Sequence, residues 1–277
     1  MHVHRHPDAG SFLGRARPWL MRSEVENNLV LRICDGLTRS VCAEVYLATV
    51  EHEGQVAACA VRTPPHKAVI TRGNRAALAC LVDDLIDRYG RLPAVLGPEP
   101  DVGEFAQLWS QRAGTMVREG MKQRVFENRE VQPPLRRPEG TLRLAGEADL
   151  SLLGPWVAAF NSEAGVFELV NPFEMARQRI AERELFVWDI DRPVSMAAQN
   201  SPTPTGAGIS LVYTPPALRG RGYASICVAE LTRLLLAGGR AYCCLFTDLA
   251  NPTSNRIYQR IGYRPVCDMT DFILETG

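Results

Sequence analysis

A short glycine-rich stretch, PPALRGRGYAS at residues 215–225, contains the residues whose types most directly indicate chemistry. Gly220 and Gly222 allow another molecule to approach the main chain without meeting a side chain, and successive amide N–H groups in such a turn can converge on an anion. Arg219 and Arg221 supply positive charge at the same place. These features predict a phosphate ligand.

The neighbouring residues distinguish between three kinds of phosphate-binding loop. A P-loop is excluded because no Gly-Lys-Ser/Thr sequence follows the glycines. A dinucleotide-binding fingerprint fits poorly, because Ser225 stands where the third glycine is needed and Pro215-Pro216 separates strand from turn. The third kind, an Arg-x-x-Gly-x-Ala loop that opens a helix and holds a diphosphate at the helix N-terminus, fits RGRGYA.

Another motif lies further along, in NPTSNRIYQRIGY at residues 251–263. Asn251, Ser254, Tyr258 and the pair Gly262-Tyr263 follow the pattern N-x-x-A-x-x-x-Y-x-x-x-G-[F/Y], with serine in place of the usual alanine. Because both motifs occur at the usual separation, residues 141–277 resemble the GNAT superfamily of acyl-CoA N-acyltransferases. The first half resembles it only in the order of its helices and strands, as a degenerate copy in a tandem form.

The resemblance implies an α/β fold of two tandem GNAT-like domains, each a mixed, mostly antiparallel twisted sheet flanked by helices. It also implies acetyl-CoA as co-substrate, with the strand ISLVY splayed at a bulge so that amides near Val212 and Thr214 meet the thioester and the pantetheine arm. The implied cofactor-binding residues are Val212, Tyr213, Thr214, Arg219, Gly220, Arg221, Gly222, Tyr223, Ala224, Ser225, Asn251 and Ser254. A carboxylate introduced at Gly222 is expected to oppose the diphosphate.

The implied reaction is attack of a neutral primary amine on the acetyl thioester through a tetrahedral intermediate, with no metal. Tyr258 is the candidate catalytic acid for the departing thiolate; its alternative role is a core aromatic, since Ile257 and Ile261 share its helix face. The general base stays open, because all five histidines lie in the first 66 residues. Glu163 is the catalytic candidate, with Glu168 and Asp248 as alternatives.

The elements that must position these residues follow from the hydrophobic pattern. In the second half we expect strands at TLRLA, ELFVWD, RPVSMAAQN, AGISLVY and AYCCLFT, and a last strand near 269–274. Long helices are expected from about 222 to 237 and from about 254 to 261. In the first half, a helix capped by Asn74 and stopped by Gly90, the strand PAVLGP and a helix ending at Gly114 repeat this ending, which indicates a duplication.

The length of 277 residues favours two domains. We expect a degenerate domain at 1–130, a solvated proline- and arginine-rich linker at 131–140 and a catalytic domain at 141–277. The N-terminal HVHRH sequence is expected to be without structure.

Composition restricts the partners. Lys and Arg total 31, as do Asp and Glu, so there is no general field to attract nucleic acid or a membrane surface. The eight cysteines show no metal or disulfide pattern, and no leader or membrane span is expected, which predicts a cytoplasmic protein.

The leading hypothesis is therefore an N-acetyltransferase acting on a small-molecule amine. A non-catalytic acyl-CoA sensor or interaction protein is the alternative, and a nucleotide-dependent oxidoreductase is a weaker one. The acceptor, the acyl length and the oligomeric state are not predicted.

Overall fold

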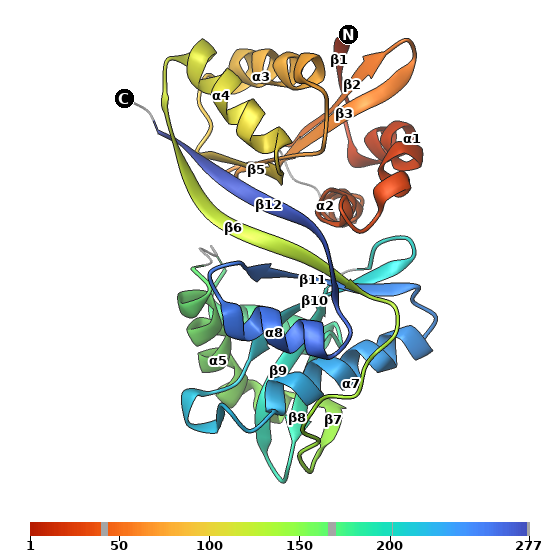
Figure 1. Cartoon of the computed structure of the whole chain (residues 1–277), viewed down its shortest axis with the longest axis vertical. Coiled ribbons are helices and arrows are strands. Elements are labelled where there is room, and N and C mark those ends of the chain that lie inside the picture. Colours follow the sequence, from red (N-terminus) through yellow and green to blue (C-terminus); the bar gives the residue numbers. More distant parts are fainter. Residues whose placement is uncertain (40–43, 166–169, 201, 276–277) are drawn as a thin grey trace. The chain divides into compact units, whose positions relative to one another are not determined.

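The computed structural model describes residues 1–39, 44–165, 170–200 and 202–275 (Figure 1). Its chain forms two compact units, Met1–Val125 with Val266–Gly277, and Phe126–Pro265. The chain therefore passes from one unit to the other twice. This division differs from the expected one, since residues 131–140 lie inside the second unit and the last strand belongs to the first.

The first unit contains an open sheet in the order β1-β2-β3-β4-β5-β12-β6. Its pairs are antiparallel from β1 to β4 and between β5 and β12, whereas β4 and β5 are parallel. Its elements are β1 (His2–Arg5), α1 (Ala9–Leu20), α2 (Asn28–Leu37), β2 (Tyr46–His52), β3 (Gln55–Arg62), β4 (Ala68–Ile70), α3 (Arg75–Tyr89), β5 (Ala94–Pro98), α4 (Asp101–Ala113), β6 (Met116–Asn128) and β12 (Arg264–Glu275).

The second unit contains strands in the order β11-β10-β9-β8-β7, with only β10 and β11 parallel among the pairs with a described register. Helices cover both faces of this sheet, and alternate residues of β8 face them. Phe186 and Trp188 pack with α7, and Leu185 and Val187 pack with α5 and α6. Its elements are β7 (Thr141–Leu144), α5 (Leu150–Glu163), α6 (Pro172–Ala181), β8 (Leu185–Asp189), β9 (Pro193–Asn200), β10 (Gly206–Tyr213), α7 (Tyr223–Ala237), β11 (Tyr242–Asp248) and α8 (Pro252–Arg260).

The order of elements confirms the predicted fold class. The series β2-β3-β4-α3-β5-α4-β6 in the first half repeats as β8-β9-β10-α7-β11-α8-β12 in the second. The division of units differs because β12 pairs antiparallel with β5, from Met269 opposite Pro98 to Ile273 opposite Ala94. The helix starts and stops agree with the sequence: the Asn74 side chain accepts a 2.9 Å hydrogen bond from the Ala77 amide, and Gly90 ends α3 with a positive φ.

The N-terminal expectation was wrong, because His2–Arg5 form β1 and pair with β2 from His2 opposite Glu51 to Arg5 opposite Ala48. Pairing with a buried strand is the reason, since it satisfies the backbone groups of this terminal segment. Within the described residues, no cluster of three potential metal ligands is present and no helix is long and apolar enough to cross a membrane.

Candidate cofactor-binding and active site

The glycine-rich loop runs from a short 3₁₀ turn, Pro216–Leu218, to the start of α7. Gly220 and Gly222 have φ angles of 76° and 90°, a left-handed conformation that other residues rarely adopt. A Cβ added to Gly220 would meet no atom within 4 Å. At Gly220, therefore, the loop exposes main chain to open space.

The N-terminus of α7 has the features of an anion site. Gly222 is its N-cap and provides no side-chain hydrogen bond. The first amide N–H groups of a helix have no intrahelical partners, and the helix dipole makes this end positive. Arg219 and Arg221 are exposed beside it. Uncapped amides and two guanidinium groups suit a diphosphate.

The corresponding loop of the first unit already contains an anion. Arg72 and Gly73 lie just before Asn74, the N-cap of α3, whereas Gly222 is itself the N-cap of α7. The Asp101 carboxylate accepts hydrogen bonds of 2.9 Å from the Gly73 amide and from Arg72 Nη1. Arg72 also donates from Nε to Glu26 at 2.9 Å. Carboxylates of the protein thus satisfy the groups that a phosphate would need.

The expected bulge in ISLVY is present in β10. Its register with β9 shifts between Ser210 and Tyr213, and Leu211 has a positive φ of 49°. The described parallel pairing with β11 covers only Gly206 to Gly208. The later part of β10 is therefore separated from this pairing, which is where the resemblance places amides near Val212 and Thr214.

The end of β10 is held by Ser195, a residue of the neighbouring strand β9. The buried hydroxyl of Ser195 donates to the Tyr213 carbonyl oxygen at 3.1 Å and is also hydrogen-bonded to Thr214 Oγ1 at 2.9 Å. This contact fixes the strand just beyond the bulge.

Tyr258 lies on α8 and is buried in the core of the second unit. Its ring packs edge-on against Tyr263, with ring centroids 5.9 Å apart. Burial raises the pKa of the Tyr258 phenol, and the nearby Cys227 thiol raises it further. Its hydroxyl has no hydrogen-bond partner among the described residues. The hydroxyl oxygen is also absent from the fully buried polar atoms that lack a partner. A protonated phenol with a free hydroxyl is compatible with both roles considered for Tyr258.

Glu163, the candidate base, ends α5 and contacts the glycine-rich loop through Arg219. Both of its carboxylate oxygens accept hydrogen bonds of 2.8 Å from Arg219 Nη2. Arg219 also donates from Nε to the Thr214 carbonyl at 2.8 Å, and its guanidinium lies 5.6 Å from the Tyr213 ring centroid. The carboxylate is therefore near the site but paired.

The other candidate residues have local roles. The Asp248 carboxylate accepts a 2.8 Å hydrogen bond from the Ala250 amide, which supports a turn. Asn251 caps α8 by accepting a 3.0 Å hydrogen bond from the Ser254 amide. Glu168 lies outside the described residues.

Arg136 is a residue of this site that sequence reasoning missed. A Cβ on Gly222 would lie 3.2 Å from Arg136 Cβ, so here the missing side chain makes room for the protein's own chain. Arg136 Nη1 also donates to the Gly220 carbonyl at 2.9 Å. Its position in a proline-rich segment of the sequence indicated only a linker.

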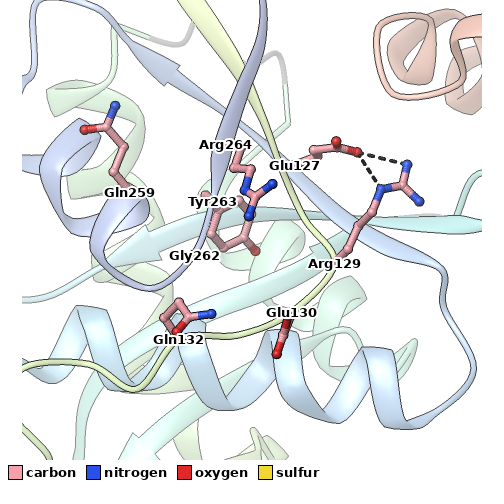
Figure 2. A pocket seen from close by; sticks show the side chains of 8 residues that line it. All are labelled: Glu127, Arg129, Glu130, Gln132, Gln259, Gly262, Tyr263 and Arg264. Atoms are coloured by element: carbon pink, nitrogen blue, oxygen red, sulfur yellow. Dashed lines mark hydrogen bonds and ion pairs between the residues drawn. The ribbon is translucent and has the colours of Figure 1, made fainter.

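A separate hollow of about 430 Å³ lies in the second unit, and its polar lining side chains are shown in Figure 2. It is lined by Glu127, Arg129, Glu130, Gln132, Gln259, Gly262, Tyr263 and Arg264. Arg129 Nε donates to Glu127 at 3.1 Å across one side of it. None of these residues was a sequence candidate for binding or catalysis.

A family model matches part of the second half of the chain. The model of the FR47-like protein family matches residues 190–272, which include both motifs. No match is found among curated protein sequences.

Solved structures resemble the whole chain. A GCN5-related N-acetyltransferase from Sphaerobacter thermophilus superposes with a TM-score of 0.66 at 19% identity, covering 98% of this chain and 94% of the other. A GNAT-family acetyltransferase from Colwellia psychrerythraea gives 0.63 at 10% identity, covering 99% and 100%. A tandem GNAT protein from the clavulanic acid biosynthesis pathway gives 0.57 at 13% identity, covering 100% and 99%.

The chain has the fold of these GNAT acetyltransferase structures. More particularly, it is a tandem form of that fold whose second half carries the FR47-like match.

Proposed function

We propose that this protein is an N-acetyltransferase that transfers the acetyl group of acetyl-CoA to a primary amine of a small-molecule acceptor. The GNAT acetyltransferase fold supports acyl transfer in general. The observation that carries the finer proposal is the uncapped N-terminus of α7, which lies in the same unit as the bulge of β10.

The loop suits the co-substrate because Gly220 faces open space and no side chain caps α7. In this proposal the amides of Gly222 to Ser225, with Arg219 and Arg221, hold the diphosphate. The backbone of β10 near Val212 and Thr214 receives the pantetheine arm and the thioester oxygen. A preorganised amide donor at that oxygen stabilises the developing charge by roughly 3 to 4 kcal/mol.

Tyr258 then serves as the acid. Because burial raises its pKa, the phenol stays protonated at neutral pH and can donate to the departing sulfur. The same burial makes a phenolate costly, so we expect Tyr258 to donate a strong hydrogen bond to the departing sulfur. Once the proton has passed to the sulfur, solvent water reprotonates the phenolate. Asn251 supports Tyr258 indirectly by capping α8.

Glu163 is the proposed base or cation-attracting group for the amine. Its carboxylate is half-exposed and forms an ion pair with Arg219. When Arg219 binds another anion instead, the carboxylate becomes free to accept a proton from the amine. The amine that enters must lose a proton before or during attack, and a carboxylate or a bound water can accept it.

The test is a screen of the purified full chain with acetyl-CoA and a panel of primary amines, in which the release of free thiol is measured. The proposal predicts amine-dependent release for at least one acceptor class and loss of release in Tyr258→Phe. Coenzyme A binding without release for every amine would contradict catalysis and favour an acyl-CoA sensor.

A further inference from the structure

The segment 132–140, here called the strap, is attached to the second unit along its length. At one end the Gln132 amide donates to the Ile261 carbonyl at 3.0 Å, just beyond α8. At the other end Trp188 Nε1 donates to the Glu139 carbonyl at 3.0 Å. A Cβ on Gly140 would lie only 2.6 Å from Trp188 Nε1. The strap is therefore mostly exposed, as its composition predicted, but it is held against the second unit by these contacts.

The middle of the strap lies against the glycine-rich loop. Arg136 Cβ occupies the space beside Gly222, and Pro138 Cδ is 3.8 Å from the position of a Cβ on that glycine. Arg136 Nη1 donates to the Gly220 carbonyl oxygen at 2.9 Å. A Cβ on Gly222 would press on the strap at Arg136, which would have to give way slightly.

The hydrogen bond fixes the orientation of one peptide group. In a planar trans peptide the carbonyl and the N–H point in opposite directions, so holding the Gly220 carbonyl toward Arg136 turns the Arg221 amide the other way. It also keeps a negative carbonyl oxygen away from the space where an anion would lie. A charged donor is suited to this, because its hydrogen bonds are stronger than those of neutral groups.

We propose that Arg136 is a positioning residue for phosphate binding, which orients the Gly220–Arg221 peptide toward the diphosphate of the co-substrate. This inference rests on the proposed function of the same loop. The remaining donors of Arg136 have no partner within the described residues, so its charge also adds to the local field of the loop.

Arg137 offers a matched control. It is the next residue in the strap, its side chain is 80% exposed, and its described ion pair is a 3.9 Å contact with Glu230. Arg136→Met and Arg137→Met each remove one positive charge and keep a long apolar stem. A difference between them therefore reports the contact with Gly220 rather than net charge.

The experiment measures the dissociation constants of coenzyme A and of dephospho-coenzyme A, which lacks the 3′-phosphate, by calorimetry. We expect Arg136→Met to weaken both about tenfold, Arg137→Met to weaken them less than twofold, and Arg136→Lys to restore part of the loss. The KM for acetyl-CoA should rise with little change in kcat.

Two outcomes would overturn the inference: equal effects of Arg136→Met and Arg137→Met, or a loss confined to coenzyme A, which would make Arg136 a ligand of the 3′-phosphate instead. Melting temperatures of both variants check that they are folded. Failure of the unmodified protein to bind either compound is a different result, because it would contradict the proposed function itself.

Discussion

Glu163 and Arg219 form an ion pair that joins the end of α5 to the glycine-rich loop, with both carboxylate oxygens 2.8 Å from Arg219 Nη2. A diphosphate in the loop would compete with Glu163 for this guanidinium. Binding of the co-substrate and release of the carboxylate would then be linked, and Glu163 would become available only when the thioester is in place.

Glu163→Gln should therefore separate two effects. Removing a competing anion should tighten coenzyme A binding by up to about fivefold, the range of an exposed ion pair, whereas turnover should fall. Calorimetry and initial rates measure the two quantities. Glu174→Gln, which breaks an exposed pair with Arg177 on α6, is the control and should change neither. Unchanged turnover in Glu163→Gln would show that Glu163 is not the general base.

Tyr258→Phe should lower kcat about 100-fold, the usual contribution of a general acid, with little change in coenzyme A affinity. Little stability should be lost, because the hydroxyl has no partner within the described residues. The control is Tyr263→Phe, which removes a 2.8 Å hydrogen bond to Thr232 Oγ1 and should cost about 1 kcal/mol of stability while kcat is kept. A Tyr258→Phe enzyme with normal kcat would show that this residue is only a core aromatic.

Gly220→Glu should abolish measurable coenzyme A binding by placing a carboxylate on the open side of the loop. Gly54→Glu is the control for the effect of backbone strain alone. Gly54 has a similar φ of 73° and a Cβ added there also meets nothing within 4 Å, but Gly54 lies in the turn between β2 and β3. Both variants should lose about 1 to 2 kcal/mol of stability, and only the first should lose binding. Equal binding in both would refute the assignment of the loop.

The filled loop of the first unit predicts one coenzyme A per chain. Asp101→Ala should cost about 2 kcal/mol of stability, because it leaves the Gly73 amide and Arg72 without their shared acceptor. Its coenzyme A affinity should not change. Calorimetric stoichiometry and thermal unfolding test this, and a stoichiometry of two in the unmodified protein would show that the first loop also binds.

Alkaline pH should destabilise the fold. Burial raises the pKa of the Cys227 and Cys243 thiols to about 12. Above about pH 8.5 an unfolded thiol loses its proton while the folded one keeps it, so stability is full below this pH and falls as pH rises toward 12. Melting temperatures from pH 8 to 10.5 should decline, and less steeply in Cys227→Ala. A flat profile would contradict the effect of burial.

Local features were predictable from the sequence, and long-range contacts were not. The helix capped by Asn74 and the bulge in ISLVY depend on neighbouring residues or on a recognised motif, and both are present. The pairing of β12 with β5 joins residues far apart in the chain, and no local pattern distinguishes it from closure of the second domain. Arg136 was missed for the same reason, since a proline-rich segment reveals its composition but not the loop on which it lies.

The central claim is that the start of α7 binds the diphosphate of coenzyme A through main-chain amides. Calorimetric titration of the folded full chain with coenzyme A tests it most directly. The account predicts heat that saturates at one equivalent and disappears in Gly220→Glu but not in Gly54→Glu. No heat with the unmodified, folded protein would contradict it.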